Sequence, residues 1–301
     1  MRVLITGITG FVGSHLARCL DAKDEIEVYG LASSGPAGDR RHVVDVTDRA
    51  ALDAAIQTCD PQVVVHLAGL SHVGTSWRVP QDYFQVNFQG TVNLVKAAAG
   101  RRVIFASSAE VYGNVPEDEQ PIVESRGAAP RSPYAITKAC AEDVALDHGA
   151  LVVRSFNSVG PGQSRQFALP SFASQLAGIQ AGRLEPKLKV GDLSPRRDFL
   201  HIDDAVTAYE LLLTQGQGGQ IYNLATGDVY SIADALHLLR EISGVEAEIE
   251  VDPERVRPVD TPLTHGDPTK LKALGWQPRY DLRRALEDLW QETLQLEGEN
   301  P

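Results

Sequence analysis

A tyrosine and a lysine four residues apart, Tyr134 and Lys138, are the side chains of this sequence best suited to proton transfer. On a helix, residues at this spacing share one face, so the two side chains would be neighbours. A phenol with a pKa near ~10 is a poor acid/base catalyst at neutral pH, and a nearby ammonium moves its pKa towards the working range. The pair therefore predicts a tyrosine acid/base tuned by Lys138, although this spacing also arises by chance on surface helices.

An upstream run, Phe105–Gly113, adds a third polar group, Ser108. The run begins in an apolar, strand-like segment, and ligands in open parallel sheets bind beyond the carboxyl ends of the strands. At such a position Ser108 can donate a hydrogen bond to a reacting oxygen. Ser108, Tyr134 and Lys138 together predict a catalytic site, and separate core or capping roles for the three are the alternative.

Three glycines near the N-terminus, Gly7, Gly10 and Gly13, predict a dinucleotide-binding turn. They follow the apolar run Val3–Ile5 and open an amphipathic stretch. Gly7 would supply the tight turn, Gly10 the close approach of backbone to a pyrophosphate, and Gly13 the close packing of the helix. The helix N-terminus adds N–H groups and a positive dipole. An ordinary glycine-rich turn is the alternative, and the position between strand and helix favours a cofactor.

The elements that must position these residues alternate along the first half of the chain. Apolar runs without polar alternation are typical of strands buried on both faces of a parallel sheet. Such runs alternate with helix-like stretches, and this order predicts an α/β fold of the Rossmann type, a doubly wound parallel sheet. The predicted strands are Val3–Ile5, Glu27–Leu31, Val63–Leu67, Val103–Ala106 and Leu151–Arg154, and the predicted helices are Phe11–Leu20, Arg49–Thr58, Asp82–Ala99 and Tyr134–Asp147.

After about Gly160 prolines punctuate the sequence, and loop-like stretches alternate with isolated helices at Ile232–Ile242 and Leu282–Leu296. One strand-like piece, Gln220–Ala225, is expected to rejoin the first sheet. We therefore predict a dinucleotide-binding domain over residues 1–160 and about 198–228. A smaller, interleaved C-terminal α/β domain over 161–197 and 229–301 would bind the substrate.

Composition narrows the class of partner. The formal net charge of −12 argues against a nucleic-acid-binding surface, which needs clustered Lys and Arg, but a few arginines can still bind a small anion. The three cysteines, Cys19, Cys59 and Cys140, have no CxxC spacing and predict reduced thiols rather than a disulfide framework or a metal site. No apolar run approaches membrane-spanning length and no leader sequence is evident, so a cytoplasmic protein is expected.

The glycine spacing is GxxGxxG, and with Ser108, Tyr134 and Lys138 in that order it resembles the extended short-chain dehydrogenase/reductases. The resemblance spans the chain from Arg2 to about Pro278. It implies that Asp45 and Val46 contact the adenine and that Leu67, Ala68 and Gly69 lie along the cofactor. It also implies that the chain forms a homodimer through the helices at 82–99 and 134–147. Further cofactor contacts are implied at Phe11, Val12, Ser33, Asn87, Ser107, Tyr134 and Lys138.

The end of the second apolar run bears on which nicotinamide cofactor binds. NAD-selective sites place Asp or Glu there to accept hydrogen bonds from the ribose 2′-hydroxyl. Ala32 stands at this position, and an acid would repel a 2′-phosphate, so its absence permits NADP. Ser33, Ser34, Arg40 or Arg41 could then contact that phosphate. We expect NADP(H), with NAD(H), or both cofactors, as the alternative.

Residues 109 and 110 narrow the reaction. The family's 4,6-dehydratases carry a proton-transferring residue and then a Glu after the catalytic Ser/Thr. This chain has Glu110 but Ala109, and a methyl group cannot transfer a proton, so elimination would be impaired. Reduction and epimerisation remain possible. Glu110 is a candidate catalytic residue, but we favour a carboxylate that hydrogen-bonds the ligand or a nearby loop.

The resemblance continues at the substrate end. It implies that Asn157, in the run Arg154–Gly162, meets the sugar or diphosphate, and that Arg257 holds the diphosphate and Asp260 the ribose hydroxyls. Arg197 suits two phosphate oxygens because guanidinium donors form a fixed fork. Further contacts are expected at Ser71 and Ser108 for the sugar and loosely at Lys189 for the base. His201 and Trp276 are expected to be structural.

Within the family, these motifs are most similar to GDP-4-keto-6-deoxy-mannose reductases, which form GDP-rhamnose. The resemblance implies NAD(P)H-dependent reduction of the C4 keto group of a nucleotide-linked 4-keto-6-deoxyhexose, most plainly a GDP-linked one. The alternatives are a nucleotide-sugar 4-epimerase with tightly bound NAD, a GDP-mannose 4,6-dehydratase, and a non-catalytic NADP-binding sensor. The intact set Ser108, Tyr134 and Lys138 argues against the last.

Overall fold

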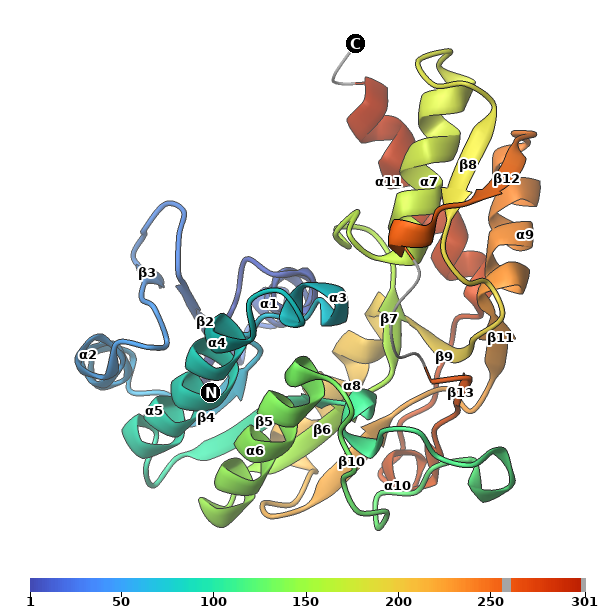
Figure 1. Cartoon of the computed structure of the whole chain (residues 1–301). Helices are drawn as coiled ribbons and strands as arrows, with labels where there is room; N and C mark the ends of the chain where they lie inside the picture. The colour runs from blue at the N-terminus through green and yellow to red at the C-terminus, as the bar shows by residue number, and fades with distance from the viewer. Residues whose placement is uncertain (256–260, 299–301) are drawn as a thin grey trace.

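A seven-stranded parallel sheet forms the larger part of the molecule (Figure 1). The structure is a computed structural model and describes residues 1–255 and 261–298. Chain order reverses between β1 and β4, and this is where ligands bind in open parallel sheets. The spatial order is β10 (Ile221–Leu224), β6 (Leu151–Ser155), β5 (Arg102–Ser108), β4 (Val63–His66), β1 (Arg2–Thr6), β2 (Glu27–Ala32) and β3 (Arg41–Val43).

Helices cover both faces of this sheet, so the predicted Rossmann-type architecture is confirmed. Residues of α1 (Phe11–Asp21) and α8 (Ile202–Thr214) share one apolar core with the sheet. Residues of α2 (Arg49–Cys59), α5 (Gly90–Ala97) and α6 (Pro133–Asp147) share the other. Strands β4 and β1 are buried almost throughout, as expected from their unbroken apolar runs. The strand predicted at 220–225 is confirmed as β10, which pairs with β6.

The predicted helix at 82–99 is broken into shorter elements. After α3 (Val73–Ser76) come α4 (Pro80–Tyr83), a π-helical stretch over Phe84–Gln89, and α5. The π-helical stretch carries Asn87, whose buried side chain bonds the backbone of Leu70 and the Thr137 hydroxyl. Such widened turns often occur at functional sites, and nothing in the 3.6-residue periodicity of the sequence could indicate one.

The remaining elements form a second, smaller part. Strand β9 (Arg196–His201) lies between β11 (Val229–Ser231) and β13 (Leu263–Thr264) and also pairs with β7 (Asn157–Val159). Strands β8 (Lys187–Val190) and β12 (Glu248–Val251) form a separate pair. Of the remaining helices, α7 (Ala168–Gln180), α9 (Ile232–Ser243) and α11 (Leu282–Gly298) belong to this part, whereas α10 (Thr269–Lys272) packs Leu271 into the core of the large sheet. Short 3₁₀ helices lie at Ala109–Tyr112, Glu117–Glu119 and Pro253–Arg255.

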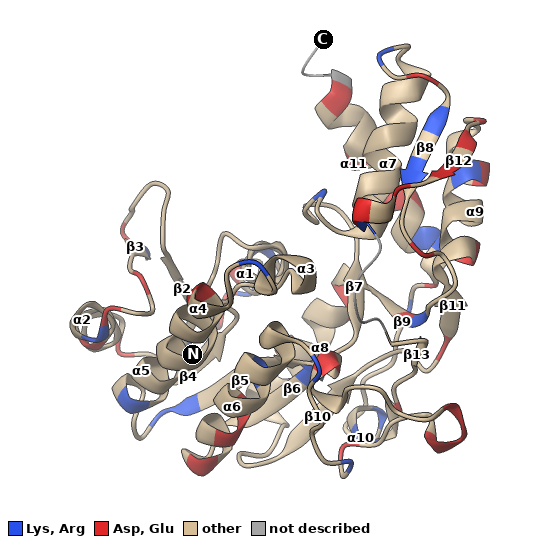
Figure 2. Cartoon of the chain, viewed as in Figure 1, with Lys and Arg blue, Asp and Glu red and all other residues tan. Residues whose placement is uncertain are grey.

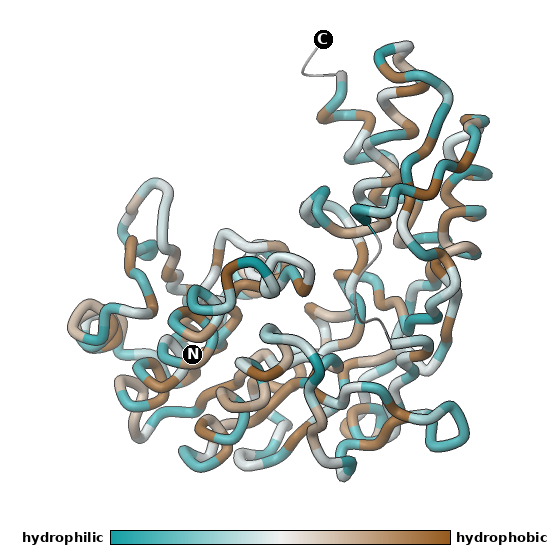
Figure 3. Tube along the Cα trace, viewed as in Figure 1, coloured by the Kyte–Doolittle hydropathy of each residue, from teal (hydrophilic) through white to brown (hydrophobic). Residues whose placement is uncertain are grey.

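This smaller part has its own apolar core, in which Phe172, Leu239 and Trp290 come from α7, α9 and α11. Hydrophobic segments recur along the strands of the large sheet (Figure 3), and acidic and basic residues are interspersed over both parts of the molecule (Figure 2). Trp276 packs in the core of the large sheet and donates to the Asp204 carbonyl at 3.1 Å, which confirms its structural role. Among the described residues, no helix is both long and apolar enough to cross a bilayer.

A buried histidine links β1, β4 and α5 in the middle of the sheet. His66 Nδ1 lies 2.7 Å from the Thr6 hydroxyl and its Nε2 lies 3.1 Å from the Thr91 hydroxyl. Burial, assisted by the charge of Lys138, lowers the pKa of His66 from 6.5 to about 3. The folded protein therefore resists protonation of this ring, whereas the unfolded chain accepts the proton near pH 6.5.

The His66 pKa predicts acid sensitivity with a definite sign. Stability from the neutral ring is complete above pH 6.5 and is lost progressively as the pH falls towards 3. At pH 5 the loss is about 2 kcal/mol, and His66→Gln, which cannot titrate, should lose that much less free energy of unfolding between pH 7 and 5. Urea unfolding at both pH values measures the difference, with the exposed His237→Gln as control. Equal pH dependence of wild type and His66→Gln would contradict the assignment.

Candidate active site

The glycine turn lies between β1 and α1 and approaches the backbone of the neighbouring strand end. Gly7 has a φ of 69°, and a Cβ there would lie 2.9 Å from the Ala68 Cα atom. A Cβ at Gly13 would lie 2.2 Å from the Gly7 carbonyl oxygen. Gly10 is the N-cap of α1 and supplies no side-chain cap, which leaves the first-turn N–H groups facing outward for an anion. These features fit a dinucleotide pyrophosphate.

The segment after β4 meets the glycine turn and Lys138. The Thr6 hydroxyl accepts a hydrogen bond from the Ala68 N–H at 3.1 Å. A Cβ built on Gly69 would lie a tight 3.0 Å from Asn87 Oδ1 and an ordinary 3.7 Å from Lys138 Nζ, so the backbone here passes close to both side chains. The structure thus places the predicted cofactor residues Ala68, Gly69, Asn87 and Lys138 together, beside the turn at Gly7.

Tyr134 and Ser108 are brought into contact by α6 and the end of β5. Ser132 caps α6 by accepting from the Ala135 N–H, and Pro133 occupies the first turn, where a missing N–H costs nothing. The Ser108 hydroxyl is near enough to the Tyr134 phenol to lower its pKa, and the Tyr134 ring packs edge-on against Tyr83 at 6.3 Å. Both residues are buried, so the pair is shielded from bulk water.

Burial raises the pKa of Tyr134 above its ordinary value, and the Ser108 hydroxyl opposes the rise. Burial also lowers the pKa of Lys138 to about 8, with the Glu142 carboxylate opposing. The Lys138 ammonium donates to the Ala106 carbonyl at 2.6 Å. The expected lowering of the Tyr134 pKa by Lys138 is therefore not the dominant effect here: burial prevails, and the phenol is held in its protonated form.

A buried ion pair supports this wall of the site, and sequence reasoning missed it. Glu142, one turn after Lys138, pairs with Arg154 of β6 through both carboxylate oxygens and accepts from the Ser107 hydroxyl at 2.7 Å. The Ser107 side chain, predicted to bind the cofactor, is thus directed at Glu142. An arginine inside the apolar run Leu151–Arg154 was the available signal, because a buried charge requires a partner.

Two of the predicted substrate-end residues line a cavity of about 510 Å³ between the large sheet and the smaller part. Asn157 and Arg197 lie in its wall; Asn157 Nδ2 donates to the Asp198 carbonyl at 3.3 Å, and Arg197 donates to the Thr261 carbonyl at 2.7 Å. Val73, which also lines the cavity, packs in one apolar cluster with Tyr134. Tyr134 thus shares a cluster with a residue of the cavity wall but is not itself among the lining residues.

The remaining predicted cofactor residues and Glu110 lie in the segments that follow β1, β2, β4 and β5 and near α2. Phe11 and Val12 form the first turn of α1, and Ser33 is exposed just after β2. The Asp45 carboxylate accepts from the Thr47 N–H and hydroxyl at 2.8 Å each. Val46 is buried, Leu67 follows β4, and Glu110 lies in the 3₁₀ helix after Ser108.

Of the remaining substrate-end predictions, Ser71 is exposed in the loop after β4. Lys189 lies on β8 outside the residues found to line the cavity, and its backbone pairs with the Gln175 amide. Arg257 and Asp260 lie outside the described residues.

Several cavity residues were not expected from the sequence. His72 and Phe167 meet edge-on across the cavity, with ring centroids 5.7 Å apart. Gln163 lines the cavity and donates to the Ser158 carbonyl at 2.9 Å, and Arg255 bonds the Ser171 hydroxyl at 3.0 Å. They come from three distant segments: the loop before α3, the connection from β7 to α7, and the 3₁₀ helix at Pro253–Arg255. No local spacing therefore connects all of them.

Comparison with known proteins places this geometry in a family. The model of the GDP-mannose 4,6 dehydratase family matches residues 4–289. The chain belongs to this family. It is an enzyme of the extended short-chain dehydrogenase/reductase type, as the glycine turn and the Ser108–Tyr134 contact imply.

Three matches, one by sequence and two to solved structures, include two kinds of reaction among its relatives. The chain is 35% identical to GDP-6-deoxy-D-mannose reductase of Pseudomonas aeruginosa over 95% of this chain and 94% of that protein. The solved structure of the reductase RMD from that organism, complexed with NADPH, matches with a TM-score of 0.88, at 34% identity over 98% of this chain and 99% of the other. The UDP-glucose 4-epimerase of Thermus thermophilus, in complex with NAD, matches with a TM-score of 0.88, at 29% identity over 97% and 99%.

Proposed function

We propose that this enzyme reduces the C4 keto group of a GDP-linked 4-keto-6-deoxyhexose with NADPH, forming GDP-rhamnose from GDP-4-keto-6-deoxy-mannose. The observation that carries the proposal is a buried tyrosine held protonated against Ser108, beside a cavity that presents Arg197. Burial makes this phenol a weaker acid, but a sugar alkoxide is a stronger base than a phenolate, so Tyr134 can still protonate a developing sugar oxyanion. The GDP-linked substrate and NADPH are supported by the similarity to the Pseudomonas aeruginosa reductase.

The environment of Ala109 favours reduction over elimination. Ala109 is 5% exposed and packs in an apolar cluster with Tyr112 and Phe156. A 4,6-dehydratase would need a proton-transferring group at this position. The chain supplies a methyl group surrounded by hydrocarbon, whereas hydride transfer with protonation by Tyr134 makes no demand on residue 109.

The protein residues divide the work of the reaction. A nicotinamide dinucleotide held at the turn Gly7–Gly13 and beside Gly69 would supply the hydride for the C4 carbonyl. Tyr134 donates its hydroxyl proton to the C4 oxygen, and Ser108 hydrogen-bonds the same oxygen. Lys138 holds the segment at Ala106 in place and faces the cofactor side at Gly69. Asn157 and Arg197 bind the diphosphate end of the substrate.

We also propose that the two domains expected from the sequence bind different ligands. Residues 1–160 and about 198–228 would bind the cofactor, and 161–197 with 229–301 the nucleotide sugar. A homodimer through α5 and α6 is supported by the exposed apolar side chains of Phe84 and Ile136 on this helical layer. A cytoplasmic location is supported by the three cysteines being free thiols.

The deciding experiment is turnover with a panel of GDP-, UDP- and dTDP-linked sugars, following NADPH absorbance and product mass. We expect stoichiometric NADPH oxidation with GDP-4-keto-6-deoxy-mannose. An epimerase would interconvert sugars with no net consumption of NADPH and would retain cofactor through purification. A dehydratase would release water from GDP-mannose. Either result would overturn the proposal.

Tyr134→Phe tests the acid. Loss of the hydroxyl should lower kcat by about 10²–10⁴-fold, because general-acid catalysis contributes that much. The dissociation constant for NADPH, measured by fluorescence, should change little. Tyr29→Phe, which removes a hydroxyl bonded to Glu27 on β2, is the matched control and should keep full activity. Substantial turnover by Tyr134→Phe would refute the assignment.

Ala32→Asp tests the cofactor preference. A carboxylate at the end of β2 would repel the 2′-phosphate of NADPH and accept from the 2′-hydroxyl of NADH. A repulsion of about 2 kcal/mol corresponds to a roughly thirtyfold rise in KM for NADPH. Ala32→Ser, which adds polarity without charge, is the control. If KM for NADPH is unchanged in Ala32→Asp, the 2′-phosphate does not bind at this strand end.

A further inference from the structure

The chain leaves the large sheet through a segment held between α1 and α11. After β7, residues Gly160–Gln163 run between these two helices, and we call this region the seam. Gly162 has a φ of 81°, and its N–H donates to Glu292 of α11 at 2.5 Å. From the other side, a Cβ at Gly162 would lie 3.8 Å from His15 Nε2 and 3.9 Å from Phe11 Cδ2. The crossover therefore touches the helix of the glycine turn and the last helix of the smaller part.

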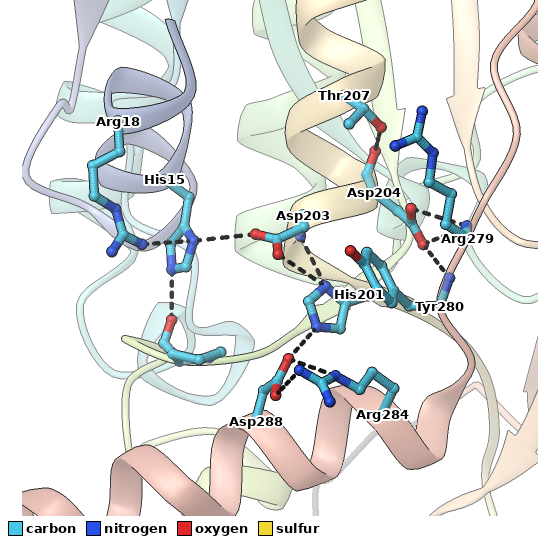
Figure 4. A network of polar contacts seen from close by, with 11 residues as sticks. His15, Arg18, His201, Asp203, Asp204, Thr207, Arg279, Tyr280, Arg284 and Asp288 are labelled. Carbon is cyan, nitrogen blue, oxygen red and sulfur yellow. Dashed lines mark hydrogen bonds and ion pairs between the residues drawn. The ribbon is translucent and has the colours of Figure 1, made fainter. Parts of the chain in front are cut away.

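His15 makes the contact from the cofactor side (Figure 4). It lies on α1 and is 8% exposed. Its Nε2 lies 2.8 Å from the Pro161 carbonyl oxygen, and its Nδ1 lies 2.9 Å from the Arg18 guanidinium. A carbonyl only accepts and a guanidinium only donates, so the proton is on Nε2 and Nδ1 accepts. The ring also packs edge-on against Phe11, at 5.7 Å, in the first turn of α1.

A second histidine continues the polar contacts to α11. His201 accepts the Asp203 N–H on Nδ1 at 3.0 Å and bonds Asp288 of α11 through Nε2 at 3.1 Å. The Asp203 carboxylate, at the start of α8, lies 3.7 Å from His15 Nδ1. Figure 4 shows these side chains converging from α1, α8 and α11. Asp288 also accepts a hydrogen bond from the Arg284 guanidinium of α11, so its carboxylate forms an ion pair within that helix.

Polar contacts, not close apolar packing, set the spacing at this seam. A cavity of about 550 Å³ opens among His15, Pro161, Asp203 and Asp288. Helix α1 packs on α8 through apolar residues such as Leu16 and Leu20, but towards α11 it meets this cavity. The bond from His15 to Pro161 is thus a short, directional restraint between the glycine turn and the crossover.

We propose that His15 is a positioning residue for hydride transfer. Through Pro161 it fixes the cofactor turn relative to the crossover, whose Gln163 lines the substrate cavity. This inference rests on the proposed function, because only a reaction between two separately bound molecules needs the two sites in register. Reacting atoms must approach to about 3–3.5 Å, and small misplacement caused far from the chemistry lowers the rate.

His15→Ala and His15→Gln test the proposal, with the exposed His237→Ala as control. His15→Ala removes the donor and should lower kcat by between about tenfold and a hundredfold, with a much smaller change in the Kd for NADPH. The Gln amide nitrogen can still donate to Pro161, so His15→Gln should recover most of kcat. A general loss of folding would not separate these two variants, and thermal unfolding of each checks it. His237→Ala should match the wild type.

Two outcomes would overturn the inference while leaving the reductase assignment intact. One is wild-type kcat in His15→Ala. The other is a folded His15→Gln as slow as His15→Ala, which would mean that the bond to Pro161 is not what matters.

A binding measurement keeps the test valid even if the wild type does not reduce the keto sugar. Bound NADPH should change the Kd of GDP in the wild type and in His15→Gln, and this coupling should be lost in His15→Ala. Absence of turnover in the wild type contradicts the proposed function alone. Coupling that is absent from the wild type, or unchanged in His15→Ala, contradicts the role of His15.

Discussion

Parallel pairing of β4, β1 and β5 is the constraint on which the site depends. Because neighbouring strands run in the same direction, the glycine turn, the segment 67–69 and Ser107–Ser108 all emerge at one edge of the sheet. Helix α6 packs on one face of the sheet and places Tyr134 and Lys138 one turn apart in its N-terminal half. All of these residues lie within a few positions of the end of a strand or on a helix, so the sheet and α6 position them directly.

Burial then determines the chemistry of the groups gathered there. It keeps the Tyr134 phenol protonated and draws the pKa of Lys138 down to about 8. The same burial would be costly for Arg154 and Glu142, and they are stable inside only as a hydrogen-bonded pair. That pair ties α6 to β6, so one buried charge network supports the helix that carries Tyr134.

The sequence could predict the elements whose signals are local. Unbroken apolar runs identified five strands of the large sheet, the Gly7–Gly13 spacing identified the turn, and β10 was expected to rejoin the sheet. It could not predict the π-helical stretch at Asn87, the pairing of Glu142 with Arg154, or the meeting of His72 with Phe167. Each of these depends on residues brought together by tertiary packing, which leaves no periodic pattern.

The burial of Ala109 also bears on how readily one activity could arise from another on this scaffold. Its methyl group is surrounded by Tyr112, Phe156 and Ala225. Introducing a carboxyl or hydroxyl group there would place an unsatisfied polar atom among hydrocarbon, at a cost of about 1–3 kcal/mol. A descendant that dehydrates sugars would therefore need substitutions in the residues packed around position 109 as well as at position 109 itself. A single substitution would not be enough to change one reaction into the other.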